Sequence, residues 1–237
     1  MTSGLVRNEE LPVNDCEDGL TAWLKDPSIG PKGKFEFITQ SDILSYVILE
    51  RAGMTPRQLF AEKVLSPLGI QDSEIDWRRD PQFTWQCDPD RRPEPVFGWL
   101  RLTVYQMTKL GMLFLARGFA GPGKAVVSPD YIDESLTAHV EGGLGGDSFG
   151  YGYLWFNGLL GGGNETWCAS GSFGQYLCID YQLGRVSVQQ RVLGDTSPDP
   201  EASSWLLRNP NMPVFVALDP SLSFGDAGAI WAEHNEK

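Results

Sequence analysis

The residues best suited to bind or react with a small molecule lie in the tract Ala169-Ser170-Gly171-Ser172, where two hydroxyl groups flank a glycine. Glycine lets a backbone approach a small molecule closely, and hydroxyls can hydrogen bond to it. A serine followed three residues later by lysine would place a nucleophile and a proton acceptor on one helical turn. None of the 237 residues forms such a pair. Ser170 is therefore interpreted either as a binding group or as an ordinary strand hydroxyl.

Cysteine and histidine are too sparse and too widely spaced to predict a metal site. Cys16, Cys87, Cys168 and Cys178 include no C-x-x-C pair and have no histidine pair nearby, so we interpret them as structural thiols. The two histidines, His139 and His234, are interpreted as solvated residues. We expect neither a metal nor a cofactor.

Charge and hydropathy narrow the classes of partner. With 19 basic and 31 acidic residues the net charge is −12, which repels nucleic acid phosphates and anionic lipid surfaces. No apolar run reaches membrane-spanning length, and no signal peptide is recognisable. We expect no nucleic acid partner and no membrane partner. The sequence predicts no cellular compartment, because a chain lacking its true start would also lack a targeting segment.

Hydrophobic periodicity predicts helices first and a sheet afterwards, which indicates an α+β fold with a segregated antiparallel sheet. Helices are expected from Ser41 or Asp42 to Gly53, after the Thr55-Pro56 cap to about Pro67, from Thr103 to about Arg117, and from Ser128 to about Ala138. Strands are expected at Tyr151–Phe156, Gln175–Tyr181 and Val186–Val192. The stretch from Asp72 to Pro95 is predicted to be a long excursion.

Several segments together resemble the β-lactamase-related serine hydrolases. Thr2-Ser3-Gly4-Leu5 is similar to an internal "TSGL" segment of that family, and "QSDILSYVILERAGM…SPLGI" is similar to its two helices ending in a "PLGM" turn. "FGWLRLTVYQMTKLGMLFLARG…VVSPDYIDES" and "ASGSFGQYLCIDYQLGRVSV" resemble its later helices and terminal sheet. Within that family, the segment "QSDILSYVILERAGM" more closely resembles the esterase and 6-aminohexanoate-dimer hydrolase branch.

The resemblance implies acyl transfer, for which this chain holds only some of the parts. In the family a serine of S-x-x-K attacks an ester or amide, a tyrosine assists proton transfer, and backbone N–H groups bind the oxyanion. The tyrosine position corresponds to Phe37 and the asparagine two residues on corresponds to Thr39, so that segment lacks its hydroxyl. Ser170 and Gly171 match the family's strand triplet, with Ala169 in place of a lysine or histidine, and Ser172 supplies the expected oxyanion N–H. No complete catalytic set is expected.

Two functions remain open at the level of sequence. The first is an N-terminally truncated piece of a serine hydrolase that lacks the first strands and the nucleophile helix, is inactive by itself, and whose full-length parent cleaves a small ester or amide. The second is a catalytically dead relative that acts as a binding or interaction module. Phe37 favours the second independently of where the chain starts.

The predicted domain organisation is a partial β-lactamase-related domain over residues 1–192 and a proline-rich extension over residues 193–237, with only short helices or strands. Asn164 lies in a formal glycosylation sequon. Trp77, Trp85 and Trp99 lie in or near the long excursion and are interpreted either as a pocket wall or as a small satellite core. Tyr46 is interpreted as a packed aromatic residue.

Overall fold

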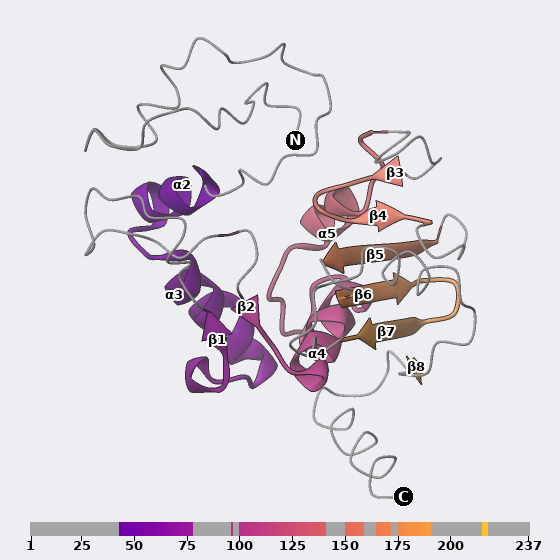
Figure 1. The fold of residues 1–237 in the computed structure, drawn as a ribbon, viewed down its shortest axis with the longest axis horizontal. Helices are drawn as coiled ribbons and strands as arrows, with labels where there is room; N and C mark the ends of the chain where they lie inside the picture. The colour runs from indigo at the N-terminus through magenta and orange to yellow at the C-terminus, as the bar shows by residue number, and fades with distance from the viewer. Residues whose placement is uncertain are drawn as a thin grey trace, which may run out of the picture. The chain divides into compact units, whose positions relative to one another are not determined.

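The computed structural model describes residues 43–77, 96, 100–140, 150–158, 165–171, 175–190 and 215–217. The chain divides into two compact units. Unit 1 comprises residues 1–66 and 71–101, and unit 2 comprises residues 67–70 and 102–237. Each unit is considered by itself. Figure 1 labels the helices and strands of both.

The described part of unit 1 contains two α-helices joined by a tight turn. Helix α2 spans Ile43–Ala52 and ends at Gly53, whose φ of 63° is the left-handed conformation that glycine adopts most easily. Helix α3 (Pro56–Phe60) begins at Thr55, whose side chain accepts a hydrogen bond from the Gln58 N–H in a reciprocal capping box. It continues as a π-helical turn over Ala61–Leu65 and a 3₁₀ turn over Ser66–Leu68. The expected positions of both helices are confirmed.

On α2 a polar residue is buried while two apolar residues are exposed. Leu44 and Val47 are 46% and 44% exposed, whereas Ser45 is buried. The Ser45 hydroxyl accepts a hydrogen bond of 3.1 Å from the Val96 N–H, which satisfies this buried polar group. Helical periodicity therefore located the helix but not its packed face.

The other described elements of unit 1 are short. A 3₁₀ turn, η3 (Asp72–Glu74), precedes strand β1 (Asp76–Trp77), which pairs antiparallel with β2 (Leu100–Arg101). The Arg57 guanidinium donates to both carboxylate oxygens of Asp72 at 2.8 and 2.9 Å. This two-point contact ties the start of α3 to η3.

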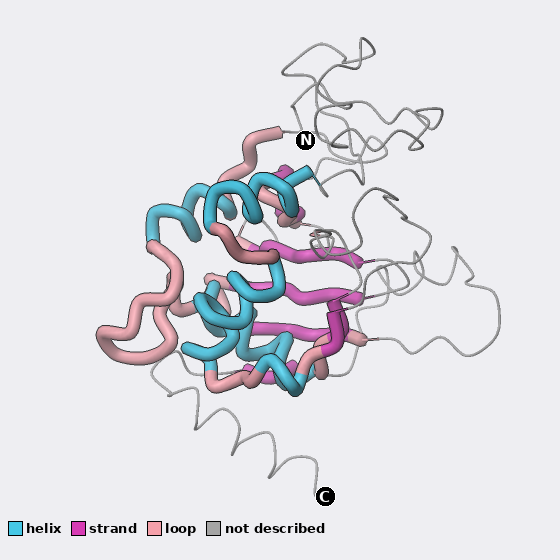
Figure 2. The backbone as a smooth tube through the Cα atoms, turned by 90° about the vertical axis from the view of Figure 1, so that its left-hand side faces the viewer, coloured by secondary structure: helices cyan, strands magenta, loops and turns pink. Residues whose placement is uncertain are grey.

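Unit 2 is an antiparallel sheet of six described strands with helices beside it. Its strands are adjacent in chain order, from β3 to β8, and Figure 2 shows them side by side. They are β3 (Gly150–Tyr151), β4 (Phe156–Asn157), β5 (Thr166–Gly171), β6 (Gln175–Asp180), β7 (Arg185–Gln189) and β8 (Phe215–Ala217). The expected α+β class with an antiparallel sheet is confirmed. Since β8 pairs with β7, the sheet continues past residue 192.

One predicted strand is wrong. Residues Tyr151–Phe156 form two short strands and a tight turn, because Tyr151 pairs with Phe156 itself. The Gly152 N–H donates to the Trp155 carbonyl at 2.8 Å, and Leu154 adopts a φ of 67°. A non-glycine residue in the left-handed region is uncommon, so the apolar run gave no sign of the reversal.

Two helices of unit 2 begin where capping residues predicted. Helix α4 (Val104–Leu115) starts at Thr103 in a capping box with Gln106, and α5 (Pro129–Ser135) starts at Ser128. Helix α5 ends three residues before the expected Ala138. Gly118 follows α4 with a φ of 88°, and a Cβ there would lie 2.1 Å from the Val127 carbonyl oxygen, so no larger residue fits.

The core of unit 2 lies between α4 and strands β6 and β7, as Figure 1 shows. The helix approaches the sheet at Gly111, where a Cβ would lie 2.5 Å from Val186 and 2.8 Å from Leu177. The buried core residues on this side of the sheet are Met112, Ile132, Leu136, Trp155, Trp167, Leu177, Ile179, Val186 and Val188. This packing holds β5 and β6 rigid from one face.

Candidate functional site

Ser170 and Gly171 occupy the last two positions of β5, and both are exposed. Across the strand pair, Ser170 lies opposite Tyr176 and Gly171 lies opposite Gln175. Ser172 lies outside the described residues. The described part of the tract identified in the sequence therefore lies at the exposed end of β5, in the central strand pair of the sheet.

The two faces of β5 contact different groups of residues, because successive side chains along a strand point to opposite faces. Trp167 and Ala169 belong to the core that packs against α4, whereas Cys168 and Ser170 point to the opposite face. On that opposite face Cys168, Tyr176 and Cys178 form a separate buried cluster. Ser170 stands at the exposed end of this cluster.

Tyr176 is a neighbour of Ser170 that the sequence analysis did not single out. Its side chain is only 5% exposed. Burial raises the pKa of Tyr176, and a side-chain hydrogen bond with Ser170 lowers that pKa in part. The phenol consequently stays protonated near neutral pH, so it can orient the Ser170 hydroxyl but cannot serve as a base. The sequence feature that could have indicated this neighbour is the short connection between β5 and β6, because such a connection is typical of two strands paired in a hairpin.

Little space is left for a side chain at Gly171, the last position of β5. A Cβ there would lie 3.1 Å from the Gln175 Cβ, closer than side chains ordinarily pack. The absence of a side chain at Gly171 therefore leaves room for Gln175 of the neighbouring strand.

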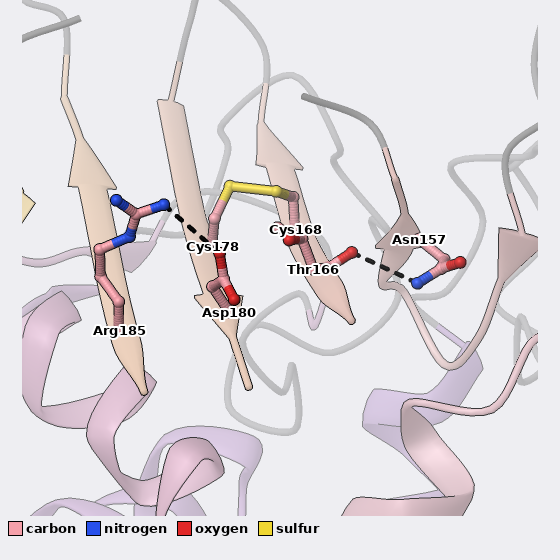
Figure 3. Close-up of a disulfide and its surroundings, with 6 residues drawn as sticks. All are labelled: Asn157, Thr166, Cys168, Cys178, Asp180 and Arg185. Atoms are coloured by element: carbon pink, nitrogen blue, oxygen red, sulfur yellow. Dashed lines mark hydrogen bonds and ion pairs between the residues drawn. A yellow bond between two sulfur atoms is a disulfide. The ribbon is translucent and has the colours of Figure 1, made fainter. Parts of the chain in front are cut away.

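A disulfide joins β5 to β6 immediately behind Ser170. Cys168 and Cys178 are directly paired in register, their Cα atoms are 4.1 Å apart, and their sulfurs are bonded (Figure 3). The interpretation of these two as free structural thiols is therefore wrong. The short connection between the strands indicates a hairpin, but whether Cys168 lies directly opposite Cys178 depends on the register of that hairpin. Cys16 and Cys87 lie outside the described residues.

Polar contacts fix the opposite end of the same strands. The Asp180 carboxylate accepts a hydrogen bond from the Leu183 N–H at 2.9 Å. Figure 3 shows two further contacts: Asp180 pairs with Arg185 at 3.3 Å, and the Asn157 side chain donates to the Thr166 carbonyl at 3.3 Å. These contacts close the β6–β7 turn and hold β4 to β5. The strand pair is thus restrained at its centre by the disulfide and at this end by hydrogen bonds.

Most of the other residues singled out in the sequence lie in segments that the structure does not describe. Phe37, Thr39 and Asn164 lie outside the described residues, as do Trp85 and Trp99. Trp77 is described, and its ring makes an edge-to-face contact with Phe60 at 5.8 Å between centroids. Within the described ranges no three His, Cys, Asp or Glu side chains gather as a metal site. The helices of those ranges include none long and apolar enough to cross a membrane.

Comparison with known proteins supports the fold alone. No family model matches the sequence, and no curated protein matches it. The structure is similar to a solved chain named "Putative 6-aminohexanoate-dimer hydrolase from Bacillus anthracis", with a TM-score of 0.56 and 18% sequence identity. The match covers 92% of this chain but 49% of the other, so this chain spans about half the length of that hydrolase. The α+β fold of this chain is therefore similar to the fold of part of that protein.

Proposed function

We propose that this chain carries the substrate-binding strand of a β-lactamase-related serine hydrolase and binds a small ester or amide at Ser170 and Gly171. The observation that carries the proposal is the exposed Ser170-Gly171 end of β5, backed by Tyr176 and by the Cys168–Cys178 disulfide. The fold likeness to a named amide hydrolase supports the same assignment.

The chain as printed is not expected to turn over such a compound. In acyl transfer a serine oxygen bonds to the carbonyl carbon, the serine proton passes to a base, and the alcohol or amine departs. The sequence contains no Ser-x-x-Lys for the first two steps. Phe37 at the tyrosine position cannot move a proton. A longer parent protein with that motif would supply the missing nucleophile.

The second candidate is a non-catalytic binding module, which Phe37 favours. The nucleotide sequence before codon 1 separates the two. An in-frame Ser-x-x-Lys a few dozen codons upstream of Thr2 would support the hydrolase parent, and its absence would support the module.

Catalysis is tested with p-nitrophenyl acetate and nitrocefin, followed by intact mass of the protein. We expect no turnover above background and no acyl adduct, because the nucleophile is absent. A burst of one equivalent of p-nitrophenol with a matching mass increase would overturn this prediction.

Binding is tested with the linear dimer of 6-aminohexanoate as the amide probe, by saturation-transfer NMR and calorimetry. Replacing Ser170 by alanine removes one neutral hydrogen bond, so we expect an affinity loss of about three- to tenfold. Leu183→Ala is the matched control, because Leu183 is 60% exposed in the β6–β7 turn. Equal affinity of Ser170→Ala and the wild-type chain would exclude Ser170 from the site.

A further inference from the structure

Helix α5 and the β3–β4 turn together present an exposed aromatic cluster, which we call the tyrosine patch: Tyr131, Tyr153, Leu154, His139 and Glu134. Tyr131, Tyr153 and Leu154 are 52%, 45% and 46% exposed. The ring centroids of Tyr131 and Tyr153 are 6.1 Å apart, and the His139 ring stacks on Tyr153 at 4.7 Å. Large apolar side chains gathered at one exposed point indicate a contact surface.

The backbone holds this cluster outward at a conformational cost. A Cβ on Gly152 would lie 2.2 Å from the Ser135 carbonyl oxygen, so the turn rests directly against the end of α5. The Tyr153 N–H donates to that same carbonyl at 2.9 Å. Leu154 adopts a φ of 67°, a left-handed conformation that is unfavourable for a residue other than glycine. Strain of this kind is often found at functional sites.

The patch is acidic as well as aromatic. The Tyr153 hydroxyl donates to a Glu134 carboxylate oxygen at 3.4 Å, and His139 Nε2 lies 3.5 Å from the same oxygen. Desolvation and then the Glu134 charge raise the pKa of Tyr153, so the phenol remains a neutral donor. Asp130 is exposed one helical turn before Glu134, and like charges at this spacing repel each other. A cation beside both carboxylates would relieve that repulsion.

We propose that the tyrosine patch binds an arginine side chain presented by a peptide segment of a partner protein. The guanidinium is planar, so it can stack on the Tyr131 or Tyr153 ring while its N–H groups reach the Glu134 carboxylate. Lysine offers a point charge without a stacking plane. The net charge of −12 favours approach of a basic segment over long range. This surface uses none of the residues assigned to the Ser170 site.

The experiment titrates the full chain at low salt with tetra-arginine amide and, separately, tetra-lysine amide. Chemical-shift changes centred on Tyr131, Tyr153 and Glu134, with tighter binding of tetra-arginine, are expected. Glu134→Gln and Tyr153→Ala should each weaken tetra-arginine binding about two- to fivefold, the range for one exposed ion pair or cation–π contact.

The control is Glu165→Gln, which removes an equal charge from another exposed position of the same unit. Its affinity for tetra-arginine should equal that of the wild-type chain. Equal losses in Glu134→Gln and Glu165→Gln would show attraction by net charge alone and overturn the proposal. Equal affinity for the two peptides, or no binding of tetra-arginine, would overturn it too. Glu134→Gln keeps the size of the side chain, so the test does not depend on Tyr153→Ala folding normally.

Discussion

Lys109 is a buried cation on the sheet-facing helix α4, a position that residue type alone would not suggest. Its side chain is 8% exposed, and its ammonium donates to the Leu68 carbonyl at 3.0 Å. The same ammonium lies 4.7 Å from the centroid of the Tyr105 ring. Lys109 thereby binds the Leu68 end of the 3₁₀ turn η2, within unit 2.

Replacing Lys109 by methionine preserves the length of the side chain but removes the charged donor. We expect a loss of about 1–3 kcal/mol in the free energy of unfolding, because the Leu68 carbonyl loses its buried partner. Urea denaturation of the wild-type chain and of the variant measures this change in the free energy of unfolding. Lys124→Met is the control, since exposed Lys124 donates to the neighbouring Pro67 carbonyl at 2.7 Å and should contribute less. A more stable Lys109→Met variant would mean that burying the charge costs more than the hydrogen bond returns.

At the scale of elements, the β5–β6 hairpin is the part on which the candidate site depends. It is packed on one face against α4, and on the other it carries the disulfide and Tyr176. Ser170 is two residues from Cys168, so the covalent link limits movement of the strand end that carries the hydroxyl. The hairpin is therefore restrained more firmly than backbone pairing alone would achieve.

Replacing Cys168 and Cys178 together by alanine should lower the free energy of unfolding by about 3 kcal/mol, because the closed loop no longer restricts the unfolded chain. Urea denaturation with and without a reducing agent measures the change. The reducing agent should destabilise the wild-type chain and leave the double variant unaffected. A wild-type chain that denatures identically in both conditions would contradict a stabilising role for the link.

At the scale of the whole molecule, buried phenols make stability sensitive to alkaline pH. Burial raises the pKa of Tyr151 and of Tyr181 to about 12, from 10.0 in the unfolded chain. Both belong to unit 2, and the Tyr181 hydroxyl donates to the Phe114 carbonyl at 2.7 Å. Between pH 10 and 12 the folded state retains protons that the unfolded state has lost.

The free energy of unfolding should consequently receive a constant contribution from these phenols below about pH 10 and a falling one from pH 10 to about 12. Urea titrations at several alkaline pH values measure the slope. Lysines titrate in the same range, so the informative comparison is Tyr181→Phe, which should fall less steeply than the wild-type chain. Parallel slopes would show that Tyr181 does not contribute.

Local chemistry in the sequence predicted much of the architecture of this protein. Thr55, Thr103 and Ser128 marked helix starts because a capping hydroxyl acts on N–H groups only two or three residues away. The alternating runs after residue 174 likewise predicted β6 and β7. Strand β5 was not among the strands expected from alternation, and Ser170 and Gly171 were identified from their residue types and from the resemblance of their tract.

Only the tertiary structure decided which residues surround that strand end. The Cys168–Cys178 bond and the Ser170–Tyr176 contact depend on the register of the hairpin. In unit 1, the burial of Ser45 likewise depends on a contact with the distant residue Val96. The reversal at Leu154 required a backbone conformation that leucine seldom adopts. Periodicity reports which side chains are apolar, but contacts across strands and helices determine which of them are buried and what they touch.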